Sequence, residues 1–283
     1  MPACTFLTMA DLGHYVDYDR DAVAPLADRG WTVDFVPWRT NADWSAYDLV
    51  VIRTPWDYQN DPDAFFAVLQ EIDAATRLEN PLEVVRWNLH KTYLRDLEAA
   101  GVPIVPTTWG RDLDAATLAA LEDEWGEAGG VVKPIVGACA EDAFRLGPDL
   151  DSAEAIATFA DRDFMAQPFV QSVVTEGEFS VFVFGGAVSH AILKTPVAGD
   201  FRVQEEYGGR IVGVEPEPAL VELAGAALEA VPHDQPLLYA RVDAVRRGDG
   251  TFAIMELELI EPSLYFPFAE GSAARFADAI AGR

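Results

Sequence analysis

The sequence contains few cysteines and histidines, and neither residue type forms a site pattern. Its two cysteines, Cys4 and Cys139, match no disulfide or metal-binding spacing, and the four histidines have no ligand spacing either. A disulfide framework is therefore not expected, and a zinc site is unsupported. The chain also lacks an apolar run of about 18 residues and a basic-then-apolar leader, so we expect a soluble, cytoplasmic protein.

Basic residues are scarce, and lysine is the scarcest of them. The 283 residues include 20 Lys and Arg against 47 Asp and Glu, which gives a net charge of −27. This charge argues against nucleic acid and against anionic membranes as partners. Only three of the basic residues are lysines, at positions 91, 133 and 194. Because the lysine ammonium is a compact point charge that commonly binds phosphate, these positions are candidate phosphate contacts.

The first 86 residues alternate between strand and helix patterns, which favours an open parallel sheet. Strands are expected at 4–10, 32–38 and 48–54, and helices at 17–29 and 62–76. Ligands of such sheets bind at the carboxyl ends of the strands, so residues after the third strand are candidate substrate contacts. The main candidates are Arg53, whose planar guanidinium suits a carboxylate, and Tyr58. The alternative for Arg53 is an ion pair with a nearby aspartate.

The middle of the chain is expected to form a small α+β lobe. Asn88 is predicted to cap a helix over 89–100, which would place Lys91 in the first turn. A cation there opposes the helix dipole, so its presence is best explained if it points at an anion. A strand is predicted at 102–107, and helices at 113–127 and 152–160. Between those helices, residues 129–147 predict a strand with Lys133, a loop of small residues whose backbone can approach phosphates, and a returning strand.

Two β-hairpins dominate the last part of the chain. The first follows a strand at 164–170, spans 175–196 and turns at Gly185-Gly186, and the second spans 239–264 around a Gly-Asp-Gly turn. The polar, glycine-bounded loop at 199–209 is typical of a segment that orders over a ligand. Helices are expected at 217–231 and 271–281.

The second hairpin carries carboxylates in an otherwise apolar row. Residues of one parity are predicted to line one face of its second strand: Phe252, Ile254, Glu256, Glu258 and Ile260. Two carboxylates in such a row are costly to bury unless a cation neutralises them. Asp243 on the neighbouring strand can add a third oxygen ligand, and oxygen ligands of this kind suit Mg²⁺. The alternative is an exposed face on which the glutamates are solvated.

The order of these features resembles the ATP-grasp superfamily of carboxylate–amine ligases. The features are NLHK at 88–91, VVKP at 131–134, a small-residue loop, QPFV at 167–170, EGE at 176–178, the lysine at 194, DFRVQ at 200–204, VD at 242–243 and MELE at 255–258. Within the superfamily the chain resembles the glutathione-synthetase-like group and the ligases that close the cycloserine ring from O-ureidoserine.

The resemblance covers essentially the whole chain and implies an ATP-grasp fold of the α/β and α+β class. It implies an N-terminal open parallel α/β sheet over 1–88, a small central lid lobe over 89–165, and a C-terminal antiparallel-sheet lobe over 166–283. It also implies ATP and two Mg²⁺ ions as cofactors, and a homodimer or homotetramer.

Roles for individual residues follow from the same resemblance. The residues implied to hold ATP are Lys91, Lys133, Gly137, Ala138, the hinge residues Gln167, Pro168, Phe169 and Val170, and, at the ribose, Glu178. The implied Mg²⁺ ligands are Asp243, Glu256 and Glu258. Lys194 and Arg202 are implied to contact the γ-phosphate or acyl-phosphate. Apart from the resemblance, Arg53 and Arg241 are candidates for gripping the substrate carboxylate, which gives Arg241 a part in catalysis, and Arg53, Tyr58 and Ser263 are expected to contact the substrate.

The implied reaction joins a small carboxylic acid, such as an amino acid or a dipeptide, to an amine-type nitrogen. The carboxylate attacks the γ-phosphate of ATP, and the nitrogen, from a second molecule or from the same one, then displaces phosphate. Two alternatives remain open: a ligase that modifies the end of a peptide or protein, and a non-catalytic ATP-binding module. The module is favoured by the loop at 137–143, where Gly137 and Ala143 stand at positions that tend to carry hydroxyls in the group.

Overall fold

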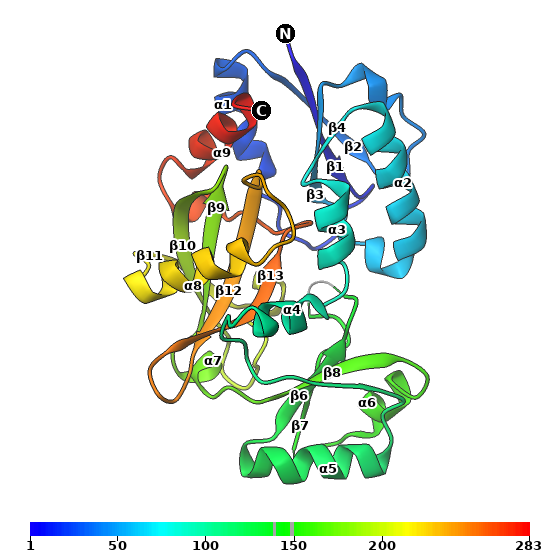
Figure 1. Cartoon of the computed structure of the whole chain (residues 1–283), viewed down its shortest axis with the longest axis vertical. Coiled ribbons are helices and arrows are strands. Elements are labelled where there is room, and N and C mark those ends of the chain that lie inside the picture. Colours follow the sequence, from blue (N-terminus) through cyan, green and yellow to red (C-terminus); the bar gives the residue numbers. More distant parts are fainter. Residues whose placement is uncertain (138–139, 148–149) are drawn as a thin grey trace.

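Three β-sheets and the helices around them form the structure, as the computed structural model in Figure 1 shows. It describes residues 1–137, 140–147 and 150–283. The phosphate contact predicted at Ala138 therefore lies outside the described residues. Within these ranges, no helix combines the length and the apolar character needed to cross a membrane.

The N-terminal sheet is parallel, with the strand order β2-β1-β3-β4, as the alternating pattern predicted. Every residue of β3 is buried, which explains its nearly continuous apolar sequence. The helix predicted at 17–29 is shorter, because a 3₁₀ turn replaces its first half. The elements are β1 Ala3–Thr8, α1 Val23–Asp28, β2 Thr32–Pro37, β3 Leu49–Thr54, α2 Pro62–Ala75, β4 Arg77–Glu79 and α3 Leu82–Asn88.

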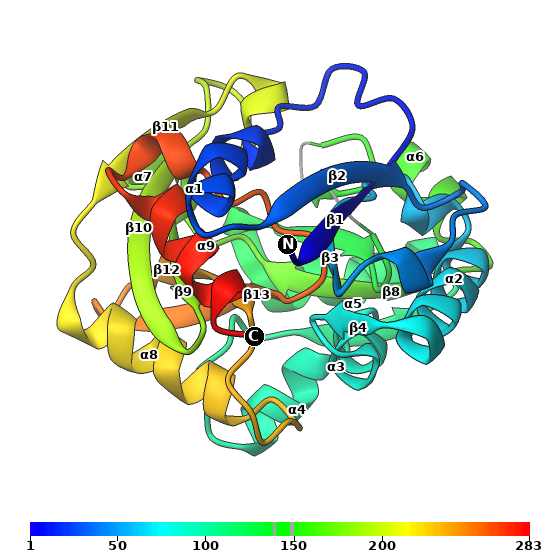
Figure 2. The ribbon, with the colours of Figure 1, turned by 90° about the horizontal axis from the view of Figure 1, so that it is seen from above.

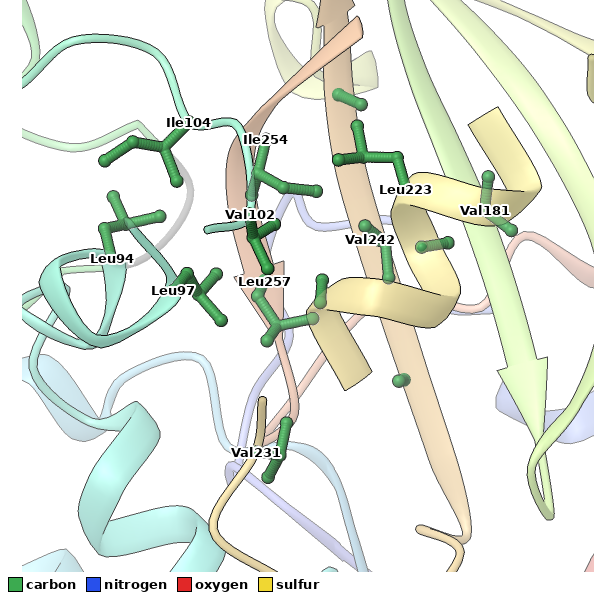
Figure 3. Close-up of a cluster of buried hydrophobic side chains, with 14 of the residues drawn as sticks. Leu94, Leu97, Val102, Ile104, Val181, Leu223, Val231, Val242, Ile254 and Leu257 are labelled. Carbon is green, nitrogen blue, oxygen red and sulfur yellow. The ribbon is translucent and has the colours of Figure 1, made fainter. Parts of the chain in front are cut away.

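The C-terminal sheet is antiparallel, with the order β11-β10-β9-β12-β13, and it contains both predicted hairpins. Helix α8 covers one face, where apolar residues of β13 and of α4 (Tyr93–Ala99) also pack (Figure 3). Helix α9 packs against α1 on the other face and joins this sheet to the N-terminal one (Figures 1 and 2). The elements are α7 Ser172–Thr175, β9 Glu178–Phe184, β10 Ala187–Thr195, β11 Arg210–Val214, α8 Pro218–Glu229, β12 Tyr239–Arg246, β13 Phe252–Glu258 and α9 Ser272–Ala281.

A bulge in β13 corrects the predicted arrangement of its side chains. Asp243 pairs with Glu256, but the next residue of β12 pairs with Ile254, so Met255 is an extra residue on β13. Ile254 and Leu257 consequently both belong to the core under α8. The single apolar row with two carboxylates was therefore a wrong prediction, because parity changes at the bulge. The bulge removes Glu256 and Glu258 from the apolar row and brings both carboxylates to the opposite face.

A small lobe lies at the end of the molecule remote from both termini (Figure 1). Its antiparallel sheet has the order β5-β8-β6-β7. The strand predicted at 102–107 is wrong, because this segment makes only an isolated bridge to β13 at Ile104, and β5 starts at Thr108. The elements are β5 Thr108–Arg111, α5 Ala115–Trp125, β6 Gly130–Pro134, β7 Phe144–Leu146, α6 Ala153–Thr158 and β8 Asp163–Pro168.

The outer edge of β13 is covered by side chains, and this corrects the cap predicted at Asn88. Asn88 is the last residue of α3, and α4 begins only at Tyr93 and ends at Ala99. The Asn88 amide donates to the Leu257 carbonyl at 2.8 Å and accepts from the Leu259 N–H at 2.9 Å. The Leu257 N–H donates to the Tyr93 hydroxyl. These side chains satisfy an edge that would otherwise expose unpaired backbone groups.

Candidate active site

A pocket lies where the small lobe, the C-terminal sheet and the loop after β3 come together. Its lining includes side chains from β6, from the segment before α4 and from the face of the C-terminal sheet that α8 leaves open. All three lysines of the chain line this one pocket. The scarcity of lysine in the sequence therefore coincides with a single site in space.

Five side chains on the open face of the sheet form a buried ion-pair network. The Arg241 guanidinium donates to both carboxylate oxygens of Asp243, with Nη2 at 3.0 Å from Oδ2, and it also pairs with Glu258. Lys194 Nζ lies 2.5 Å from Glu178 Oε1 and 3.4 Å from Asp243 Oδ1. Burial alone would raise the pKa of Asp243, but Arg241 and Lys194 hold it below its usual range. Asp243 is thus ionised and held between two cations.

The other two lysines come from outside this sheet, Lys91 from the segment before α4 and Lys133 from β6, and they differ in their partners. Lys91 Nζ pairs with Glu256 Oε1. Lys133 makes no hydrogen bond or ion pair within the described ranges. Burial, together with the positive charge of Lys91, lowers the pKa of Lys133. An anionic ligand at Lys133 would supply a partner that the described residues do not.

The chemistry of the predicted metal ligands fits Mg²⁺, although their present partners are cations. Asp243, Glu256 and Glu258 each face a Lys or Arg, and no group of three or more His, Cys, Asp or Glu in the described part of the chain is arranged around a metal position. Burial raises the pKa of Glu258, and the neighbouring carboxylates raise it further. Crowded carboxylate oxygens of this kind suit a hard divalent cation. Lys91 and Arg241 would have to turn away to admit it.

The predicted hinge also lines the pocket, and part of its backbone is available. The Phe169 N–H donates to the Gly129 carbonyl at 2.9 Å. The Val170 N–H has no partner in the part of the chain that the structure describes. The Gln167 side chain donates to Thr107 Oγ1 at 3.0 Å, which fixes the end of β8. Pro168 also lines the pocket, and so does Gly137 of the predicted phosphate loop.

The loop at 199–209 forms another wall of the pocket and is attached to the N-terminal part of the chain. Arg202 lines the pocket while its guanidinium makes paired hydrogen bonds to Asp200, with Nη2 at 2.8 Å from Oδ2. The hydrogen bonds from Arg202 lower the pKa of Asp200 to about 2. The Tyr18 hydroxyl donates to the Glu205 carboxylate at 3.0 Å. The loop is therefore held against the site in this structure.

Arg53 does not reach the pocket, which corrects its predicted role as a substrate contact. Its side chain is fully buried, pairs with Asp19 at 3.0 Å and donates to the Pro262 carbonyl at 2.6 Å. The alternative ion pair is the arrangement found, because Asp19 lies close to the end of β3. Tyr58 and Ser263, the other two predicted substrate contacts, do line the pocket.

Glu261 lines the pocket and was missed by the sequence reasoning. The Tyr58 hydroxyl lies beside its carboxylate and lowers the pKa of Glu261 against the effect of burial. Glu261 follows Glu258 by three residues, after β13 has ended, so strand parity does not predict where it points. The only available signal was a third glutamate in the sequence ELELIEP.

This combination of fold and site defines an ATP-grasp ligase. An antiparallel sheet with a carboxylate-bearing hairpin faces a small α+β lobe across a pocket that contains lysines from both lobes.

The chain belongs to the family of the cycloserine biosynthesis protein DcsG. It is 36% identical to DcsG from Streptomyces lavendulae over 95% of this chain and 94% of that protein. Residues 4–80 match the model of the N-terminal domain of D-cycloserine synthetase DcsG. The crystal structure of D-cycloserine synthetase DcsG superposes with a TM-score of 0.85 at 33% identity, and covers 99% of each chain.

More distant ligases share the fold. D-alanine–D-alanine ligase from Bacillus anthracis superposes with a TM-score of 0.66 at 14% identity, over 100% of this chain and 97% of the other. The ligase PsnB, solved with a phosphomimetic variant of a minimal precursor, Mg and ADP, superposes with a TM-score of 0.67 at 18% identity, over 99% of this chain and 97% of the other. The predicted superfamily and fold class are confirmed. The protein is an ATP-dependent, ADP-forming carboxylate–amine ligase, of a class whose cofactors are ATP and Mg²⁺.

Proposed function

We propose that this ligase activates the carboxylate of a small amino acid of the O-ureidoserine type and closes a ring with a nitrogen of the same molecule. The observation that carries the proposal is the relationship to DcsG, a protein of cycloserine biosynthesis, at 36% identity over nearly the whole chain. The small lobe of residues 89–165 acts as a lid between the N-terminal region of 1–88 and the C-terminal region of 166–283. The enzyme works in the cytoplasm, where ATP is available, as a homodimer or homotetramer.

The nucleotide lies between the two lobes that carry the lysines. Lys91 and Lys133 hold the phosphates, and Gly137 of the phosphate loop lets the backbone approach them. Two observations support this: Lys133 makes no ion pair with any residue that the structure describes, and Lys91 is close enough to exchange Glu256 for a phosphate. The backbone of 167–170 binds adenine, for which the Val170 N–H is available, and Glu178 binds the ribose.

Asp243, Glu256 and Glu258 hold two Mg²⁺ ions. When bound, these ions neutralise charge on the β- and γ-phosphates. The support is chemical, because three carboxylates gather in a pocket that raises the pKa of Glu258 by burial and by mutual repulsion.

The remaining cations act on the reacting groups. Arg241 orients the substrate carboxylate for attack on the γ-phosphate, while Lys194 and Arg202 neutralise charge on the transferred phosphoryl group. The substrate nitrogen then attacks the acyl carbon, the C–O bond to phosphate breaks, and phosphate leaves with the bonding electron pair. Water must be excluded in this interval because it would hydrolyse the acyl-phosphate.

Enclosure of the pocket favours a small substrate over the end of a peptide. The loop at 199–209 lines the pocket and is fastened to Tyr18 through Glu205. A peptide acceptor would need an open cleft along this loop. The PsnB structures, which hold a precursor peptide, keep the peptide alternative worth testing.

The test is release of ADP from ATP and Mg²⁺ in the presence of O-ureidoserine, amino-acid pairs, dipeptides or short peptides. We expect O-ureidoserine to trigger ADP release, with one substrate molecule consumed per ADP and a cyclic product by mass spectrometry. Consumption of two molecules per ADP would instead show joining between molecules. Glu256→Gln should nearly abolish turnover with the fold intact, and Glu222→Gln, an exposed position on α8, is the matched control. Full turnover by Glu256→Gln would exclude its assignment to the metal.

A further inference from the structure

The open face of the sheet and the segment after β13 place five carboxylates in the pocket, and four of them are in ion pairs. Glu178 pairs with Lys194, Glu256 with Lys91, and Asp243 and Glu258 with Arg241. Glu261 makes no ion pair within the described residues, and the polar group nearest in effect to its carboxylate, besides the charges around it, is the neutral Tyr58 hydroxyl.

Burying the Glu261 carboxylate without a cation costs free energy, and a positively charged ligand can remove this cost. Burial raises the pKa of Glu261 to about 7, although the Tyr58 hydrogen bond and the charge of Lys91 act in the opposite direction. A paired cation stabilises a buried carboxylate, and a buried carboxylate without such a cation weakens the folded state. An uncompensated negative charge that lines a pocket is therefore suited to a positively charged ligand group.

The segment that carries Glu261 is held in place by three side chains, two from the end of β3 and the loop after it and one from β12. Trp56 Nε1 donates to the Glu261 carbonyl at 2.9 Å. Arg53 Nη2 donates to the Pro262 carbonyl at 2.6 Å, and Arg241 Nη1 donates to the Ser263 carbonyl at 3.3 Å. Three consecutive carbonyls are thus fixed, which limits the movement of the Glu261 side chain. Such support is what a binding group needs in order to recognise one geometry.

We propose that Glu261, oriented by Tyr58, binds the α-ammonium group of the amino-acid substrate and thereby selects acids that carry this amine. The inference deepens the proposed function and rests on it. An amino acid carries its ammonium and carboxylate on the same carbon, so its recognition requires an anion and a cation at neighbouring positions. Glu261 supplies the anion, and Arg241, which bonds the backbone two residues later, supplies the cation. The Lys133 side of the pocket remains for the phosphates.

The test compares two substrates that differ only in the amine. ADP release is measured at saturating ATP and Mg²⁺ with O-ureidoserine and with 3-(ureidooxy)propanoic acid, which lacks the α-amino group. Glu261→Gln should lower kcat/KM for O-ureidoserine by about 10- to 150-fold, the range expected for a hydrogen bond to a charged group. Its kcat/KM for the desamino acid should stay within about twofold of wild type, so discrimination for the amine collapses. Glu222→Gln should retain both values.

The outcomes separate this inference from the proposed function. Equal losses for both substrates, or a raised KM for ATP with discrimination intact, would overturn the assignment of Glu261 to the amine. Wild-type protein that releases no ADP with any amino acid would overturn the proposed function, and this inference with it. If Glu261→Gln does not fold, Tyr58→Phe tests the proposal instead, because it keeps the Glu261 carboxylate and the aromatic ring. We expect Tyr58→Phe to reduce the discrimination between the two substrates several-fold. Unchanged discrimination would contradict the proposal.

Discussion

Replacing Asn88 by alanine tests how strand β13 is held in place. The Asn88 side chain makes hydrogen bonds of 2.8 and 2.9 Å to the carbonyl of Leu257 and the N–H of Leu259, and it is buried. Alanine would leave both backbone groups without a partner, at about 1–3 kcal/mol each. We therefore expect Asn88→Ala to reduce the free energy of unfolding by about 2–6 kcal/mol.

Urea unfolding followed by tryptophan fluorescence measures this loss, and two further variants calibrate it. Tyr93→Phe removes only the acceptor for the Leu257 N–H and should cost about 1–3 kcal/mol. Asn41→Ala changes an exposed asparagine and should stay within about 0.5 kcal/mol of wild type. An Asn88→Ala protein that unfolds at the same urea concentration as Asn41→Ala would refute the role given to this side chain.

Three further predictions concern the charges of the site and the core. Lys133→Met should raise the KM for ATP by about 10- to 100-fold, since the phosphates would lose the ammonium that we propose binds them; a change below about twofold in a steady-state titration would contradict this. Arg53→Leu should cost about 3–5 kcal/mol in urea unfolding because it leaves Asp19 buried and unpaired, and stability equal to wild type would show that the pair contributes nothing. Burial lowers the pKa of His190 to about 4. Between pH 6.5 and 4 the unfolded chain therefore binds a proton that the folded chain does not, and up to about 3 kcal/mol of stability is lost as the pH falls. His190→Phe should lose less stability than wild type over this pH range, and equal losses would rule out the buried histidine as the cause.

The elements that the sequence predicted correctly depend on local patterns. The apolar run of β3, the glycine turn between β9 and β10, and the strand–loop–strand around Lys133 all follow from residues that are close in sequence. The family resemblance worked for a related reason, because it depends on the order of short motifs and needs no knowledge of their contacts.

The incorrect predictions share a dependence on distant partners. Asn88 looks like a helix cap, but its amide bonds to a strand about 170 residues later. Arg53 looks like a substrate contact, but Asp19 and the Pro262 carbonyl occupy its guanidinium. The bulge at Met255 reverses the parity on which the position of the carboxylates was predicted. No local pattern contains this information, because propensity and periodicity describe a segment without its partners.

The gathering of all three lysines in one pocket gives the protein an unusual chemical selectivity. The outer surface carries its positive charge as arginine, which common acylating reagents leave intact, so it offers them no lysine amine. Acylation of lysine should therefore report on the pocket alone. Protection by ATP, mapped by peptide mass spectrometry, would then read occupancy of the site directly from the native chain, with no mutation or fluorescent label.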